Sequence, residues 1–389
     1  MTANIFTSGN PIYAGFLIAA LILIGIEVIQ ERRRVGMHGF AWWALGGLTL
    51  INLLGLLYFW INRISVEMAL TGGEQSAVAI LQHALRGEPI YRLWYDSDPL
   101  TTPPLFQILS IPFAFVFGAN IGTLRLVSVL GIIASGLIVF RAVTEKTNSS
   151  WWGMVGLGLF ATAVGMMDSY MGTASPAPWL LCCALLGTYL IDRNHSESDI
   201  MLGILVLSNA VWIQQAGILF LIGALAYLTW NRGWAVAAHY WLMGVALTVL
   251  AWVTIGPLLF GDQFLSLTVL TPLKNLDFSF SGLSRYGLFV SGTYPLLALA
   301  SSALVIGGLL WERNKFDIWQ AQFVAAVLLG LLTTLFVPGG ATMLTLTSVW
   351  FIVIGLQALY QWSNQIVIAQ QYQLHLAALF ASFVVAFRA

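Results

Sequence analysis

Long apolar runs alternate with short polar connections along nearly the whole chain. A helix that crosses a hydrocarbon core about 30 Å thick needs about 20 predominantly apolar residues. The pattern therefore predicts an all-α polytopic membrane protein with about 11 to 12 transmembrane helices. The predicted helices lie at residues 12–30, 42–62, 122–143, 151–167, 175–191, 201–214, 216–230, 240–260, 287–311, 317–337, 342–361 and 373–388.

Two further apolar stretches, both between the second and third predicted spans, are too short to cross. In the first, one apolar stripe follows the helical i, i+3, i+4, i+7, i+8 spacing and consists of Ala77, Ile80, Leu81, Ala84 and Leu85. The second, residues 104–117, has about fourteen residues and is interrupted by Pro112. We expect two interfacial helices in the loop 63–121.

Basic residues indicate the orientation of the chain. Arg32, Arg33 and Arg34 follow the first span, which places that connection in the cytoplasm by the positive-inside rule. Alternation then puts the loops 63–121 and 261–286 outside. The sequence suggests three parts: an extra N-terminal helix with its basic turn (1–40), a main transmembrane module (41–260) and a C-terminal part (261–389).

The composition agrees with a membrane protein. Of 389 residues, 59% are hydrophobic and 8% are charged, against about 25% charged residues in soluble domains. The net charge of zero gives no reason to expect nucleic acid as a partner. Cys182 and Cys183 are neighbours in an apolar run, which predicts two buried thiols rather than a disulfide or a metal site.

Ionisable residues gather at the predicted outer side, where the heads of two amphiphilic molecules could react. They are Glu67, Glu74, Glu88, Asp96, Asp98 and Asp168, with Lys274, Asp277 and Arg285 in the second outer loop. Hardly any ionisable residue falls in the middle of a predicted span, which argues against an ion-coupled transporter.

Several motifs in this region resemble a known family. "ALRGEPIY" follows Glu74, and the chain continues with "PPLFQIL", "FGANIGTLRLVSVL" and "MMDSYMG". Their order resembles that of GT-C glycosyltransferases that use polyprenyl-phosphate sugars, nearest to the aminoarabinose-transferase-like and protein-mannosyltransferase-like branches. The matching positions are Glu74, Pro103-Pro104-Leu105, Phe117-Gly118, Arg125-Leu126 and Asp168. The resemblance covers residues 60–195.

The resemblance implies a GT-C-like fold and a membrane glycosyltransferase, with its site on the extracytoplasmic face of the plasma (inner) membrane. The donor would be a polyprenyl-phosphate sugar and the acceptor a lipid, glycan or protein, with membrane lipids and other membrane proteins as further partners. In such a reaction a carboxylate takes the acceptor proton, a role we predict for Glu74. Asp168 would orient the acceptor or help to hold an optional divalent metal.

The leaving phosphate gathers charge that a cation can stabilise. We predict Lys274 and Arg285 for this contact, with Arg92 as a rival. Asp96-Ser97-Asp98 matches a metal-binding Asp-x-Asp pattern.

Each of these residues also has a structural interpretation. Thr71 to Glu74 fits a capping box, Asp168 could cap a helix, and Asp-Ser-Asp-Pro is an ordinary turn sequence. Lys274 and Arg285 could equally anchor the chain to lipid headgroups.

The chain also departs from the family pattern. Gly73-Glu74 stands where the family usually has Asp, often followed by Glu, and the helix 12–30 is extra. These departures favour the alternative of a non-catalytic GT-C-fold subunit in a larger complex. The surviving acids and their spacing favour the enzyme.

Overall fold

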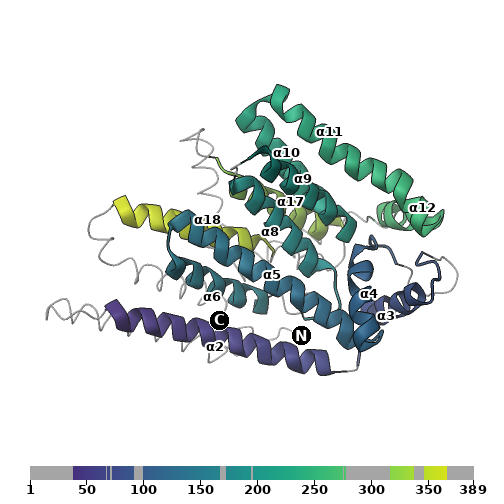
Figure 1. Cartoon of the computed structure of the whole chain (residues 1–389), viewed down its shortest axis with the longest axis horizontal. Helices are drawn as coiled ribbons and strands as arrows, with labels where there is room; N and C mark the ends of the chain where they lie inside the picture. Colours follow the sequence, from purple (N-terminus) through teal and green to yellow (C-terminus); the bar gives the residue numbers. More distant parts are fainter. Residues whose placement is uncertain are drawn as a thin grey trace.

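The computed structural model describes residues 38–66, 68–70, 72–91, 100–166, 172–193, 196–274, 276, 316–336 and 346–365. Within these residues all regular secondary structure is helical (Figure 1). The longer helices are α2 (His38–Ser65), α3 (Gly72–Leu85), α4 (Leu105–Phe117), α5 (Ile121–Thr147), α6 (Ser150–Met166), α8 (Ala177–Arg193), α9 (Glu197–Ile213), α10 (Gly217–Arg232), α11 (Trp234–Leu250), α17 (Ile318–Phe336) and α18 (Thr347–Gln365).

The hydrophobic pattern located these helices well. Nine of the twelve predicted spans coincide with a described helix or, for 240–260, with a continuous helical stretch. That stretch joins α11, the π-helical turn η1 (Ala251–Ile255) and α12 (Gly256–Phe260). The predicted spans 12–30, 287–311 and 373–388 lie outside the described residues, so the total of 11 to 12 stays a prediction.

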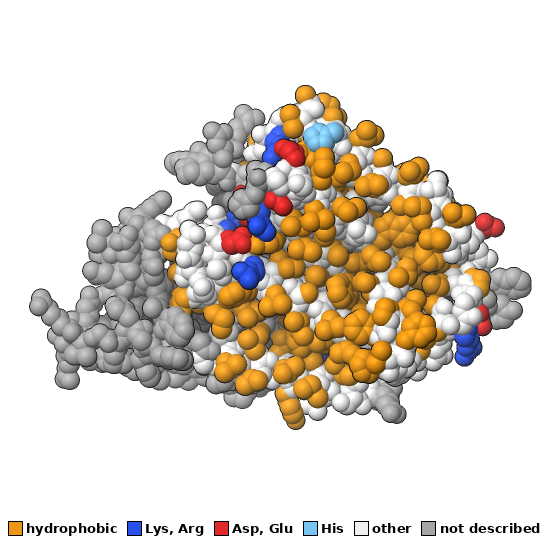
Figure 2. Space-filling view, viewed as in Figure 1, with side chains coloured by type: hydrophobic (Ala, Val, Ile, Leu, Met, Phe, Trp, Pro, Cys, Tyr) orange, Lys and Arg blue, Asp and Glu red, His pale blue; other side chains and the backbone are white. Residues whose placement is uncertain are grey.

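Two described helical stretches, Ile121–Thr147 and Trp234–Phe260, are each long and apolar enough to cross a membrane by length and composition. Further described helices at predicted spans, such as α2 with 28 residues and α17 and α18 with 19 residues each, also contain apolar stretches. Figure 2 shows charged side chains gathered at separate places on the visible face, with apolar side chains covering the surface between them. An apolar band between polar ends is the surface expected of a bundle in a bilayer.

The two short helices predicted between the second and third spans are confirmed as α3 and α4, which lie together at one end of the bundle (Figure 1). Gly87 ends α3 with a positive φ of 71°, a conformation that glycine adopts without steric cost. The N–H of Glu88 bonds to the carbonyl of His83, and that of Gly87 to the carbonyl of Ala84. This pair of bonds is a Schellman motif, which satisfies the last carbonyls of the helix.

Close backbone contact holds the middle of the bundle together at the crossing of α8 and α9. A Cβ atom added to Gly187 would lie 3.0 Å from the carbonyl oxygen of Gly203 and 2.5 Å from Leu207 Cγ. Small residues at such crossings let helix backbones approach each other, which matters in a membrane because lipid tails are as apolar as the side chains.

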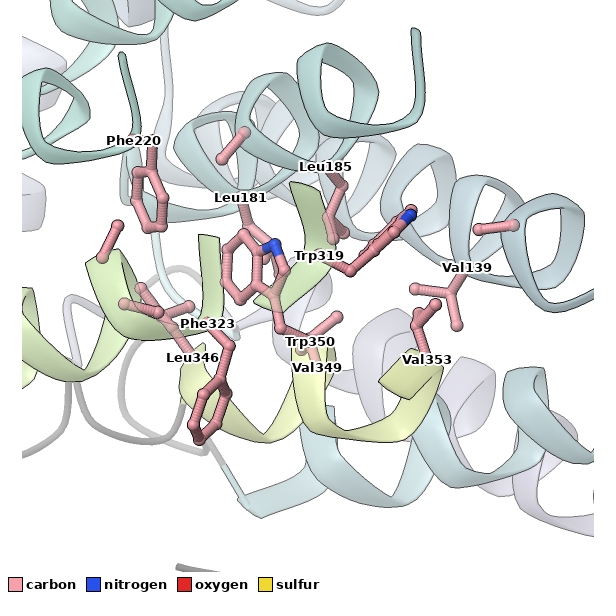
Figure 3. Close-up of a cluster of buried hydrophobic side chains, with 14 of the residues drawn as sticks. Val139, Leu181, Leu185, Phe220, Trp319, Phe323, Leu346, Val349, Trp350 and Val353 are labelled. Atoms are coloured by element: carbon pink, nitrogen blue, oxygen red, sulfur yellow. The ribbon is translucent and has the colours of Figure 1, made fainter. Parts of the chain in front are cut away.

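The C-terminal helices α17 and α18 pack into the same core as α5 to α10. Figure 3 shows Trp319 and Trp350 among side chains from α8 and α10. The rings of Phe220 and Trp350 stack with their centroids 5.0 Å apart. The predicted division of the chain at residue 260 stays a prediction, and α17 and α18 share one core with the helices before it.

Opposite ends of the bundle carry different polar groups. The end formed by α3, α4 and the N-terminus of α5, called here the α3–α4 end, contains Glu74. At the other end, Lys146 Nζ lies 3.1 Å from carboxylate oxygens of both Asp192 and Asp317. These three residues come from α5, from α8 and from the residue just before α17, so this ionic cluster fixes the three segments relative to one another.

The loop 261–286 also contains helical structure. A continuous helical stretch is present there, made of α13 (Gln263–Leu265), the π-helical turn η2 (Ser266–Leu270) and α14 (Thr271–Lys274). Gly256 lets this stretch fold back on α12, because a Cβ at this position would lie 2.2 Å from the Phe264 ring.

The arrangement predicts which connections share a side of the membrane. In a variant with both native cysteines replaced by alanine, we expect a cysteine at Arg86 to react with an impermeant thiol reagent in intact cells, and one at Ser198 to react only after lysis. Both positions are exposed, so burial does not limit either reaction. Equal labelling in intact cells, or labelling of Ser198 alone, would contradict the predicted topology.

Candidate functional site at the α3–α4 end of the bundle

Glu74, the residue predicted as a catalytic base, lies in the first turn of α3 with none of its surface exposed. Its carboxylate faces Arg125 in the second turn of α5, which is also buried, with 1% of its surface exposed. Arg125 Nε lies 2.9 Å from one carboxylate oxygen and Nη2 lies 2.7 Å from the other. This bidentate geometry is the strongest form of a carboxylate–guanidinium contact.

All five N–H groups of Arg125 have acceptors. Two go to Glu74. Nη1 donates to the carbonyls of Arg63 at 2.6 Å and Val66 at 2.8 Å, and Nη2 donates to that of Met68 at 3.0 Å. A guanidinium has five donors and no acceptor, so Arg125 is saturated. It thereby satisfies carbonyls at the C-terminal end of α2 and in the connection that follows.

The Glu74 carboxylate is saturated as well. Besides the two bonds from Arg125, one oxygen accepts the backbone N–H of Ala174 at 2.8 Å and the other accepts that of Leu70 at 2.7 Å. An ionised carboxylate offers about four acceptor sites, and all four are used. The bond to Leu70 ties Glu74 to the chain just before α3. The capping box predicted from Thr71 to Glu74 stays a prediction, because Thr71 lies outside the described residues.

These contacts decide the charge state of Glu74. Burial alone would raise the pKa of the carboxyl group. The hydrogen bonds from Arg125, Ala174 and Leu70 and the charge of Arg125 outweigh burial, so the pKa is lowered to about 2. At neutral pH the carboxylate is ionised, with its lone pairs engaged. Taking up a proton from an acceptor would require these bonds to break, so the role of Glu74 as a base stays a prediction.

The segment 172–176, which leads into α8, is fastened to the same place. Ser128 Oγ on α5 donates to the carbonyl of Ser175 at 2.9 Å and accepts its N–H at 3.1 Å. Gly172 lies against the guanidinium of Arg63, where an added Cβ would be 2.2 Å from Nη1. The segment therefore contacts α2, α3 and α5 at once.

A second set of contacts joins the loop 63–121 to the loop 261–286. The amide of Gln215 donates to the carbonyls of Thr101 in the first of these loops and Thr268 in the second. The Tyr91 ring packs edge-on against the fully buried ring of Phe264, with 5.2 Å between centroids. The Tyr91 hydroxyl donates to the carbonyl of Thr102 at 2.8 Å, and burial raises the pKa of Tyr91.

The other predicted site residues are placed as follows. Lys274 is exposed at the end of α14. Asp168, Arg285, Arg92, Asp96 and Asp98 lie outside the described residues, so their roles stay predictions. Among the residues that the structure describes, no three His, Cys, Asp or Glu side chains are grouped so as to hold a metal ion.

Sequence reasoning missed the role of Arg125, which it used only as part of a motif. A signal was available, because a cation near the start of an apolar spanning helix is costly unless it is partnered. The identity of the partner was not readable, since Glu74 lies 51 residues earlier. Ser128 and Ser175 gave no signal, because small hydroxyl residues are common in membrane helices.

Comparison with known proteins gives a likeness of fold. No family model matches the chain. No curated protein matches it by sequence. Two solved structures are similar in fold: ArnT from Cupriavidus metallidurans bound to undecaprenyl phosphate, and the same protein in the apo state.

The alignment with the bound form has a TM-score of 0.57 and 13% identity, and covers 88% of this chain and 77% of that chain. For the apo form the TM-score is 0.55 at 13% identity, covering 88% and 76%. The GT-C-like fold expected from the sequence motifs is therefore confirmed.

The charge state of Glu74 predicts a pH-dependent stability. Folding lowers the pKa of Glu74 from 4.5 to about 2. The ionised carboxylate therefore stabilises the folded state fully above pH 4.5, and this stabilisation is lost as the pH falls from 4.5 towards 2. The shift corresponds to about 3 kcal/mol, and leaving Arg125 buried without its partner costs about 3–5 kcal/mol. We expect Glu74→Gln to melt well below the parent protein at pH 7, and the difference to shrink at pH 3.

Thermal unfolding of the detergent-purified proteins between pH 7 and pH 3 measures this effect. Asp262→Asn removes an exposed carboxylate at the same end of the bundle and should change the melting temperature little at any pH. A Glu74→Gln variant that melts like the parent protein at pH 7 would mean that the pair contributes no net stability.

The amides of Gln214 and Gln215 offer a matched comparison. Gln215→Leu removes two hydrogen bonds, which should cost about 1–3 kcal/mol of unfolding free energy. Gln214 Oε1 is buried and accepts no hydrogen bond, so Gln214→Leu should be tolerated. The melting temperatures of the two variants test this difference. Equal decreases in melting temperature would show that the two hydrogen bonds of Gln215 do not stabilise the contact between the loops 63–121 and 261–286.

Proposed function

We propose that this protein is a membrane glycosyltransferase that moves a sugar from a polyprenyl-phosphate carrier to an acceptor on the extracytoplasmic face of the plasma (inner) membrane. The observation that carries the proposal is the fold, which follows ArnT over 88% of this chain, including a form of ArnT that holds undecaprenyl phosphate. The motifs at Glu74, Pro103-Pro104 and Arg125, found from sequence alone, lie at the α3–α4 end and support the same reading.

The reaction we propose is one displacement at the anomeric carbon of the donor sugar. The acceptor hydroxyl oxygen forms the new bond to this carbon, and the bond from the carbon to the phosphate oxygen breaks. The electron pair of the broken bond leaves with the polyprenyl phosphate. The acceptor proton passes to a carboxylate. With the lone pairs of Glu74 occupied, Asp168 is our proposal for that carboxylate and Glu74 is the rival.

The leaving phosphate calls for a cation. We propose Lys274 for this contact, with Arg285 and Arg92 as further donors, because an ammonium or guanidinium makes strong charge-assisted hydrogen bonds to phosphate. Exposure of Lys274 at the end of a short amphiphilic helix supports this choice, since a phosphate on a membrane-buried chain would lie near the surface. Asp96 and Asp98 remain our proposal for an optional divalent metal.

One observation favours a second candidate function, that of a non-catalytic GT-C-fold subunit. The acid that the sequence nominates as the base is held by four hydrogen bonds, and the residue before it is Gly73. Such a protein would keep the fold and the lipid contacts and act through other membrane proteins.

The proposal is tested with the purified full chain in lipid nanodiscs and undecaprenyl-phosphate-linked sugars. We expect Lys274→Ala to raise the donor KM about tenfold or more, because charged hydrogen bonds contribute about 1.5–3 kcal/mol, with the acceptor KM unchanged. Arg86→Ala, at an exposed cation on the first outer loop, should leave both constants unchanged.

Equal donor KM values for the parent and Lys274→Ala would remove Lys274 from the donor site. The non-catalytic subunit would be favoured if the protein neither transfers sugar nor binds undecaprenyl phosphate and if it co-purifies with other membrane proteins at fixed stoichiometry.

A further inference from the structure

The contacts of Glu74 and Arg125 reach well beyond their own ion pair. Arg125 bonds to three carbonyls in the stretch from Arg63 to Met68, and Glu74 bonds to Leu70 on one side and Ala174 on the other. The pair therefore joins the end of α2, the start of α3, the start of α5 and the segment 172–176.

The segment 172–176 depends on these contacts for its position. It precedes α8, which begins at Ala177, and within the segment the carbonyl of Pro176 accepts the N–H groups of Trp179 and Leu180 from the first turn of that helix. Three of its anchors are the carboxylate of Glu74, the hydroxyl of Ser128 and the close contact of Gly172 with Arg63. All three anchors lie at the α3–α4 end, where the proposed donor and acceptor would meet.

We infer that Glu74 and Arg125 are positioning residues of the proposed transferase. The pair holds the segment 172–176 against α3 and α5 and so fixes the shape of the α3–α4 end, and Glu74 does not exchange a proton with the acceptor. The inference rests on the proposed function for its catalytic consequence, while the anchoring itself can be measured without a substrate.

The hydrogen-bonding groups of Glu74 and Arg125 are all occupied, and this distinguishes a positioning role from a catalytic one. A base needs a free lone pair directed at the acceptor, and each lone pair of Glu74 already accepts a bond. A positioning pair has a different signature, because removal of one partner leaves a buried charge alone, whereas removal of both leaves a neutral site. The effects of the two single changes should therefore not add.

The first experiment uses this non-additivity. Transfer by purified Glu74→Gln, Arg125→Gln and the double variant is measured with an undecaprenyl-phosphate-linked sugar, each as a pH profile. We expect each single variant to lose at least tenfold in kcat/KM and the double variant to exceed both singles severalfold. The acidic limb of the profile should keep its position in every variant. A double variant no better than Glu74→Gln, or the loss of the acidic limb in Glu74→Gln, would overturn the inference and return Glu74 to the role of base.

A second pair of variants acts on the segment without touching the ion pair. Ser128→Ala removes both bonds to Ser175, and we expect a severalfold loss of kcat/KM with an unchanged pH profile. Ser135→Ala is the control, since Ser135 lies seven residues further along α5, is fully buried, and donates to the Gly131 carbonyl within the helix. Equal activity of the Ser128 and Ser135 variants would show that the position of the segment does not matter for transfer.

The third measurement is independent of activity. Thr173 is buried, with 5% of its surface exposed, so a cysteine at Thr173, in a chain with Cys182 and Cys183 replaced by alanine, should react slowly with a thiol reagent. We expect Glu74→Gln to accelerate the reaction at least tenfold and the double variant to slow it again. An unchanged labelling rate in Glu74→Gln would refute the anchoring. If Glu74→Gln is labelled faster but the parent protein shows no transfer activity, the proposed function is refuted and the anchoring is confirmed.

Discussion

A carboxylate and a guanidinium that are both shielded from solvent impose the strictest constraint on this structure. Neither ion is tolerated alone in a low-dielectric interior, so each must find its full set of partners at the same place. Arg125 finds five acceptors and Glu74 finds four donors. Those partners belong to distant stretches of chain, and Ala174 alone lies 100 residues from Glu74. The fold must bring these stretches together before the pair can form.

The packing of the rest of the bundle depends on the interactions that can hold helices together in a membrane. Apolar packing between helices gains little when lipid tails are equally apolar, so close backbone contact and polar links have to supply specificity. Gly187 and Gly203 provide the close contact between α8 and α9. Lys146, Asp192 and Asp317 link α5, α8 and the start of α17 at the end opposite Glu74. The helices are thus fixed by charge at both ends and by shape between them.

These two kinds of constraint explain what could be predicted from the sequence. Apolar runs and glycine or proline boundaries are local, so the described helices, including α3 and α4 in the first loop, were located from the sequence, with ends that differ from the observed ones by a few residues. Gly87, with its positive φ, ends the first of these helices. Pairing is not local. Thr71 to Glu74 fits a cap, a base or an ion pair equally well from neighbouring residues, and only the position of Arg125 on another helix separates them. The predicted base and the predicted cap were the same residue because both roles require a carboxylate.

The four hydrogen bonds that occupy the Glu74 carboxylate also affect how a protein with this fold could lose or change its function. An ion pair that anchors four stretches of chain serves the fold whether or not a sugar is transferred. Selection for stability alone would therefore keep Glu74 and Arg125 in a protein that had lost its chemistry. Catalysis adds a separate requirement, a carboxylate with a free lone pair near the acceptor, and Asp168 is the residue that we propose for it in place of the predicted base Glu74. The presence of the motif around Glu74 and Arg125 is consequently evidence for the fold, while evidence for transfer has to come from residues that the ion pair leaves free.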